Sequence, residues 1–102
     1  MKQIIERKLY DTETATKIGR CDNGFNGNDF DFESETLYYT KNEQYFIHGE
    51  GGPRSSYGTR RGNLLVWGEQ IEPISHDKAR CWAEEKLTAE EYIEEFGQPE
   101  DA

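Results

Sequence analysis

Two short runs of aromatic and β-branched residues, separated by a polar turn, constrain the fold of this chain more than any other feature. The runs are residues 35–40 and 44–48, and residues 41–43 connect them. Such residues favour extended backbone, and a short polar connection is typical of a β-hairpin. Side chains alternate between the two faces of a strand. We therefore expect Leu37 and Tyr39 opposite Tyr38, and Tyr45 and Ile47 opposite Phe46 and His48.

Other extended segments are expected on both sides of this hairpin. Residues 4–11 predict one N-terminal strand, and the threonine-rich stretch 11–19 predicts a second that stops at Gly19. Residues 22–31 are rich in Asn, Gly and Asp and predict a loop with tight turns. After the hairpin we expect a sharp break at residues 49–53, a loop over 54–63 and a last strand at 64–67.

The C-terminal quarter carries the signals of two helices. Ser75 is a suitable N-cap for the first helix, and Thr88 with Glu91 matches a capping box for the second. Ala89, Tyr92, Ile93 and Phe96 then repeat at helical spacing before Gly97. Strands followed by helices predict an α+β fold, with an antiparallel sheet of about four or five strands and two short helices on one face or end. Residues 1–97 are expected to form one domain and residues 98–102 a disordered tail.

The same C-terminal segment holds most of the net charge of −9. Nine acidic and only three basic residues lie between Asp77 and Asp101. Such a chain should be repelled by nucleic acid and by anionic membranes, and attracted to basic protein surfaces. The alternative is an ordinary solvated helix face. The residues expected to bind a basic partner are Glu84, Glu85, Glu90, Glu91, Glu94 and Glu95, with Asp29 and Asp31, followed by Glu33 and Glu35, extending the field from the loop.

The spacing of the last glutamates supports this interpretation. Residues 90, 91, 94 and 95 cover about 7.5 Å of helix axis, at about 1.5 Å per residue. That spacing gives about one charge per 2 Å, against roughly one per 1.7 Å in duplex DNA. A face of this kind can occupy a groove that is built for nucleic acid.

Metal and cofactor chemistry are not expected from this chain. Its possible zinc ligands are Cys21, His48, His76 and Cys81, which include no closely spaced pair of cysteines, and Cys81 is expected to be buried. The glycine-rich stretch 49–52 lacks the Lys-Ser/Thr ending of a phosphate-binding loop. We therefore predict neither a metal nor a cofactor. Arg54, Arg60 and Arg61 are expected to pair with the protein's own carboxylates or to keep their loop soluble, and the alternative is that they border an interface.

The cellular location follows from similar arguments. No segment approaches the roughly 20 apolar residues that span a bilayer. The first residues lack the apolar run of a secretory signal. Two cysteines 60 positions apart are too few for a disulfide framework. A reduced cytosolic protein is expected.

Three stretches of the sequence resemble small acidic proteins carried by phages, plasmids and conjugative elements, a group that includes anti-CRISPR proteins. The stretches are Lys8–Ala15, Glu35–Lys41 and Gly49–Pro53, and the helical ending from Ile71 to Glu84 completes the resemblance over residues 8–97. The turn at 41–43 departs from the group because it lacks a glycine. The resemblance implies an inhibitor in the cytoplasm of a bacterial host, which binds the basic nucleic-acid channel of a CRISPR effector without binding nucleic acid or membranes itself.

Three hypotheses follow from these observations. The first is a non-enzymatic anti-CRISPR-type inhibitor whose acidic surface mimics nucleic acid. The second is a small enzyme or ligand-binding protein centred on residues 49–57, with His48 and Glu50 as acid and base. The third is an interaction module that docks through exposed aromatic residues, for which Tyr38, Phe46 and Tyr57 are the candidates.

Overall fold

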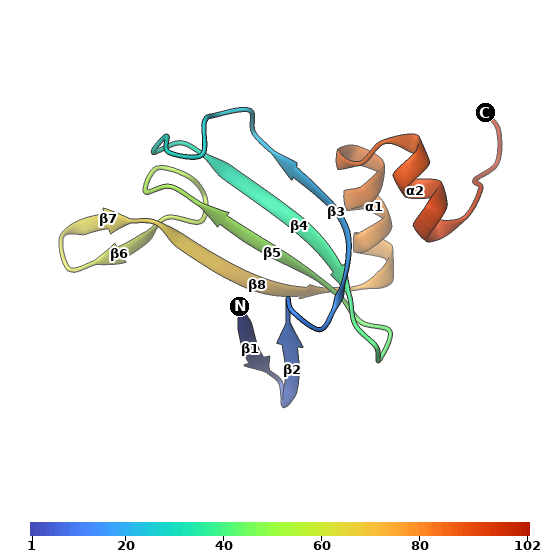
Figure 1. Ribbon diagram of the computed structural model, residues 1–102, viewed down its shortest axis with the longest axis horizontal. Coiled ribbons are helices and arrows are strands. Elements are labelled where there is room, and N and C mark those ends of the chain that lie inside the picture. The colour runs from blue at the N-terminus through green and yellow to red at the C-terminus, as the bar shows by residue number, and fades with distance from the viewer.

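The computed structural model describes residues 1–102 and has eight strands followed by two helices (Figure 1). The strands form a central four-stranded sheet and two separate hairpins, all antiparallel. This arrangement confirms the predicted α+β fold. The elements are β1 (Lys2–Ile5), β2 (Lys8–Asp11), β3 (Thr16–Asp22), β4 (Glu33–Tyr39), β5 (Tyr45–Gly51), β6 (Thr59–Arg61), β7 (Leu64–Val66), β8 (Gly68–Ile74), α1 (His76–Lys86) and α2 (Ala89–Phe96).

The central sheet has the strand order β3-β4-β5-β8, and the predicted hairpin forms its middle pair. Tyr39 lies opposite Tyr45 at the turn, and the pairing extends to Glu33 opposite Gly51. The sharp break predicted from Gly49 onward is therefore wrong, because β5 continues through Gly51. The glycines serve packing instead, since a side chain at Gly49 would overlap the ring of Tyr57.

The segment before the hairpin differs from its prediction. Residues 4–11 do not form one strand: β1 and β2 form a tight hairpin, with Glu6 and Arg7 at positive φ in its turn. Gly19 does not stop a strand either. It lies inside β3, where a side chain would collide with Leu87 of the helical region. Close approach between helix and sheet explains that glycine better than a turn does.

The segment after the hairpin contains two strands that the sequence did not predict. Residues 54–63 are not entirely loop, because β6 pairs with β7 around a turn at Gly62, whose φ is +65°. The whole of β8 pairs with β5. Its charged residues and Pro73 have low strand propensity, so the sequence does not predict this strand. Proline is tolerated there because β8 is an edge strand of the sheet.

Both predicted helix starts are confirmed. The Ser75 hydroxyl accepts a hydrogen bond from the backbone of Lys78 at 3.1 Å, and Thr88 forms the capping box with Glu91. In α2, however, no residue is fully buried, so the predicted core-facing stripe packs only in part. Neither helix is long or apolar enough to cross a bilayer.

The core has two layers, one on each face of the central sheet. On the helix side, Leu37, Tyr45 and Ile47 pack against Ala79 of α1. On the other side, Phe46 and Ile71 pack against Tyr10 of the β1–β2 hairpin. The alternation of the central strands is as predicted. It sorts their side chains between the helices and the N-terminal hairpin.

Candidate functional site

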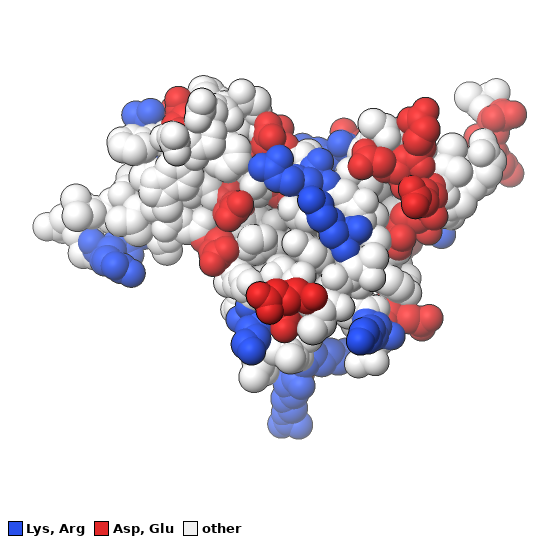
Figure 2. Space-filling model, viewed as in Figure 1, with Lys and Arg blue, Asp and Glu red and all other residues white.

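Acidic side chains gather over the helical end of the molecule (Figure 2). Basic ones gather over the β1–β2 hairpin, at the tip of β6–β7 and in a row across the middle of the face shown, next to the acidic group (Figure 2). Glu84 and Glu85 of α1 and Glu90 and Glu94 of α2 are exposed. None of them forms an ion pair, because the three ion pairs of the molecule all lie outside the helices. We call these four residues the acidic helix surface.

The structure separates the four glutamates of α2 into two groups. Glu91 is part of the capping box, where its carboxylate accepts hydrogen bonds from the backbone and hydroxyl of Thr88, both at 3.1 Å. Glu95 accepts a hydrogen bond of 2.6 Å from the hydroxyl of Tyr45. Only Glu90 and Glu94 remain free, one helical turn or about 6 Å apart along the axis. The charge density of the free carboxylates is therefore lower than the spacing in the sequence implies.

The acidic residues of the predicted loop are engaged within the protein. Asp31 accepts two hydrogen bonds from Arg54, at 3.0 and 3.1 Å, which matches the expectation that this arginine pairs internally. Asp29 accepts a hydrogen bond from the backbone of Asp31 at 2.8 Å. The loop also lies at the far end of β3 from α2 (Figure 1). It does not continue the acidic helix surface.

Glu33 and Glu35 attach another segment to the sheet. Glu33 accepts a hydrogen bond of 2.8 Å from the backbone of Ser56. Glu35 accepts one from the hydroxyl of Tyr57 and one of 2.9 Å from the indole of Trp82 in α1. These two carboxylates therefore hold the segment after β5, and the second also holds α1.

Two tyrosine hydroxyls donate to carboxylates in half-buried surroundings, Tyr45 to Glu95 and Tyr57 to Glu35. Burial raises the pKa of both hydroxyls, and the hydrogen bond to the carboxylate raises it further. A tyrosine in the unfolded chain ionises near pH 10. The folded protein therefore holds these protons at a pH where the unfolded chain has lost them.

This difference predicts a loss of stability in alkali. The two protonated tyrosines contribute fully to the free energy of unfolding below about pH 9. This contribution is lost as the pH rises past about 10 toward the raised pKa values of the folded state. Urea unfolding between pH 8 and 11 should show a falling midpoint, with a shallower fall in the variant Tyr45→Phe/Tyr57→Phe. Tyr92→Phe is the control, because the Tyr92 hydroxyl donates no hydrogen bond. If the unfolding midpoint falls equally with pH in the native chain and in both variants, Tyr45 and Tyr57 are not the cause of the loss.

The zinc ligands considered from the sequence do not converge. Cys21 is half-buried, and burial raises the pKa of its thiol. Cys81 is exposed rather than buried on the core face of α1. The His76 ring bonds the backbone carbonyl of Glu43 at 2.9 Å. Only His48 lies near other potential ligands.

His48 and Glu50 are neighbours on one face of β5, and Glu69 of β8 joins them. Nε2 of His48 lies 2.8 Å from a carboxylate oxygen of Glu69. Glu50 and Glu69 lie directly opposite each other in the antiparallel register. One ligand atom from each of the three residues falls within 4.8 Å of the others. Glu69 was not singled out from the sequence, because only its pairing with β5 brings it to this place.

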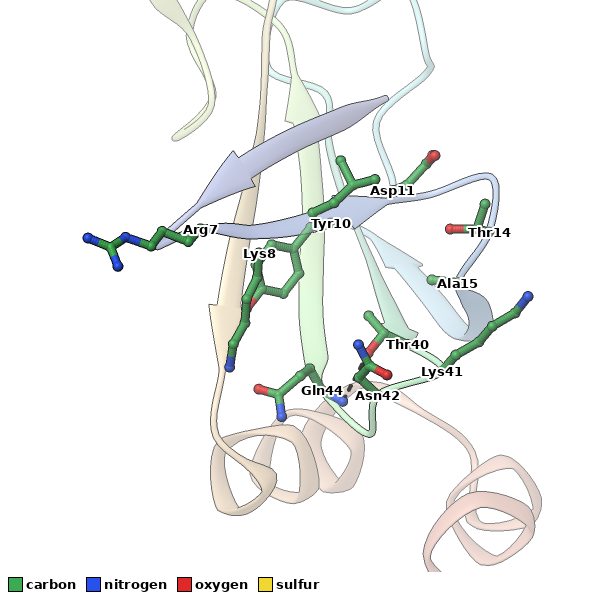
Figure 3. Close-up of a pocket in the computed structure, with 11 residues that line it drawn as sticks. Arg7, Lys8, Tyr10, Asp11, Thr14, Ala15, Thr40, Lys41, Asn42 and Gln44 are labelled. Atoms are coloured by element: carbon green, nitrogen blue, oxygen red, sulfur yellow. Dashed lines mark hydrogen bonds between the residues drawn. The ribbon is translucent and has the colours of Figure 1, made fainter.

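A cleft of about 420 Å³ lies between the N-terminal hairpin and the turn at residues 40–44 (Figure 3). Arg7, Lys8 and Lys41 border it. Arg7 and Lys41 extend away from one another at its two ends, so their charges do not converge (Figure 3). The cleft gives this end of the molecule a basic character but no built anion site.

The aromatic residues considered for docking are not exposed. Phe46 is completely buried, Tyr38 stacks on it at a centroid distance of 5.1 Å, and Tyr57 is held by Glu35. The third hypothesis is therefore wrong about its residues. Leu64, Leu65 and Trp67, on and beside the β6–β7 hairpin, form one group of exposed apolar side chains. The others are spread over the molecule, at Met1, Ile4, Leu9, Phe25, Phe30 and Ile93.

No protein-family model matches the chain, and no curated protein or solved structure matches it.

Proposed function

We propose that this protein is a non-enzymatic inhibitor that binds a basic nucleic-acid-binding surface of a CRISPR effector. The acidic helix surface makes the contact. Its carboxylates occupy positions on the effector that otherwise bind phosphates, so the effector loses access to its nucleic acid. The exposed and unpaired state of Glu84, Glu85, Glu90 and Glu94 is the observation that carries the proposal.

The charge arrangement of α2 supports a role in binding. A helix carries partial negative charge at its C-terminal end, so acidic residues in the last turn cost about 0.3–1 kcal/mol each at an exposed site. Glu94 lies in that turn and no basic residue accompanies it. Within the fold, its carboxylate gains no hydrogen bond or ion pair in return. A basic partner would compensate this cost.

The partner class comes from the resemblance described above and from electrostatics. A CRISPR effector holds its guide and target in a strongly positive channel. Long-range attraction between that channel and a chain of net charge −9 accelerates association at low salt. The basic β1–β2 hairpin lies at another end of the molecule (Figure 2) and is directed away from the effector in this arrangement.

The variant Glu90→Lys/Glu94→Lys tests the proposal. Both side chains are exposed and neither caps the helix nor bonds Tyr45, so the fold should persist. We expect it to lose tenfold or more of its potency as an inhibitor of target-DNA binding by a purified CRISPR effector, since charge reversal replaces attraction with repulsion. Fluorescence anisotropy of labelled DNA, across a panel of effector types, measures this loss.

The matched control is Glu13→Lys/Glu43→Lys. Each double variant changes the net charge from −9 to −5, because every Glu→Lys substitution adds two units. The control residues are exposed and lie outside both helices, and Glu43 contacts the start of α1 only through its backbone carbonyl, which the substitution preserves. Equal potency of the two variants would reject the acidic helix surface as the contact. Inhibition that persists at high salt and disappears in Leu64→Ala/Trp67→Ala would assign the contact to the β6–β7 hairpin instead.

A further inference from the structure

We propose that His48, Glu50 and Glu69 form a zinc-binding site on the face of β5 and β8 opposite the helices. The register places Ile71 across from His48, and Ile71 packs with Tyr10 and Phe46 on the side of the N-terminal hairpin. The site is therefore on the other side of the sheet from α1. It is independent of the acidic helix surface.

The three ligand atoms already lie close to the geometry that zinc requires. Zinc binds imidazole nitrogen and carboxylate oxygen at about 2.0–2.2 Å in a tetrahedron, which sets ligand atoms about 3.4 Å apart. Here all three lie within 4.8 Å of one another, and two of them are 2.8 Å apart. To complete the arrangement, the Glu50 side chain rotates inward and the Glu69 carboxylate moves about 0.6 Å away from His48. Both glutamate side chains are exposed and have room for these movements.

The cluster also has an electrostatic reason to take up a cation. Glu50 and Glu69 are a directly opposed cross-strand pair of like charge, which is unfavourable in a sheet. His48 contacts Glu69, but the Glu50 carboxylate makes neither a hydrogen bond nor an ion pair. A divalent ion between the two strands removes the repulsion and gives Glu50 a partner.

Several features favour zinc over harder cations. An imidazole with only two carboxylates suits zinc, whereas calcium and magnesium prefer a shell made entirely of oxygen ligands. The His48 side chain is only 15% exposed, and paired strands fix the backbone of all three ligands. Three protein ligands leave one coordination position for water or an anionic group. Glu50 and Glu69 also line a pocket of about 630 Å³ that contains Trp67, and this pocket can admit such a group.

Isothermal titration of the full chain with zinc chloride alone tests the site. We expect one zinc per chain, a rise in the melting temperature with zinc concentration, and a visible absorption band of tetrahedral type when cobalt replaces zinc. His48→Gln, Glu50→Gln and Glu69→Gln should each weaken binding by about tenfold or more. Glu72→Gln is the matched control, because Glu72 is exposed on β8 but lies on the other face of the strand.

Zinc binding at the other potential ligands, His76 and Cys81, would contradict the proposal. Zinc binding that survives Glu50→Gln and Glu69→Gln, but disappears in His76→Ala or Cys81→Ser, would place the ion elsewhere and overturn the proposal. Absence of any zinc binding by the native chain would do the same. Glu50→Gln remains informative if His48→Gln fails to fold, because the Glu50 side chain is exposed and its carboxylate forms no ion pair within the fold. Normal zinc binding by Glu90→Lys/Glu94→Lys would confirm that the site is independent of the acidic helix surface.

Discussion

Replacement of Phe46 by alanine is expected to lower the free energy of unfolding by about 3–5 kcal/mol, the usual cost of removing a buried phenylalanine from a core. Phe46 is completely buried. Its ring stacks on Tyr38 and meets the edge of Tyr10 at a centroid distance of 5.5 Å. Small domains are stable by only about 5–15 kcal/mol, so this single change removes a large fraction of the total.

The location of Phe46 gives the prediction a second, local consequence. The β1–β2 hairpin forms a sheet of its own, separate from the central sheet. Its contact with the body depends on Tyr10 packing against Phe46 and Ile71. In Phe46→Ala, backbone amides of β1 and β2 should therefore exchange with solvent faster than those of β4.

Urea unfolding followed by circular dichroism measures the global effect, and hydrogen exchange measures the local one. Phe25→Ala is the control, because Phe25 is 48% exposed in the loop before β4 and its loss should cost less than about 0.5 kcal/mol. Phe46→Leu should recover part of the stability, since it fills much of the cavity. A loss below 1 kcal/mol in Phe46→Ala, or unchanged protection of the hairpin, would show that Tyr10 and Phe46 do not attach it.

The parts of the fold that sequence could predict are those decided by neighbouring residues. The hairpin of β4 and β5 follows from its β-branched and aromatic runs and the polar turn between them. The helix starts follow from the side chains of Ser75 and Thr88, which bond the backbone three residues further on. In these elements the local preference and the tertiary structure agree.

The parts that sequence could not predict depend on distant partners. β8 forms because β5 offers it an open edge, and its own residues, with Pro73 and several charges, give a weak strand signal. Gly19 and Gly49 indicate turns in isolation, yet each accommodates a side chain from another element, Leu87 and Tyr57 respectively. Close packing of this kind has no local signature.

The candidate sites show the same division. The sequence shows that the helices hold an excess of carboxylates. It does not show which of these carboxylates form hydrogen bonds within the protein. Glu91 and Glu95 are engaged in the capping box and with Tyr45, which leaves Glu90 and Glu94 free. Glu69 reaches His48 only through the register of β8 on β5. No spacing within the chain reports that proximity.

Gly49→Ala is expected to destabilise the protein by about 2–3 kcal/mol, although alanine is the smallest possible addition. A Cβ at this position would occupy the space of the Tyr57 ring. Glu35 lies directly opposite Gly49 in the sheet and accepts the hydrogen bond from the Tyr57 hydroxyl. The added methyl group must therefore expel the ring, and the bond to Glu35 is lost with it.

A double-mutant cycle separates this mechanism from simple backbone strain. Once Tyr57→Ala has removed the ring, the methyl group of Gly49→Ala has room, so the double variant should be no less stable than Tyr57→Ala alone. Urea unfolding of the four proteins measures the coupling, and Gly27→Ala, which has open space around it, is the control. Additive losses would mean that Gly49 is required for its backbone rather than for Tyr57. If Gly49→Ala costs nothing further in the Tyr57→Ala background, the role of Gly49 is to leave space for the Tyr57 ring. The absence of a side chain at Gly49 then allows the segment after β5 to pack on the sheet and Tyr57 to bond Glu35.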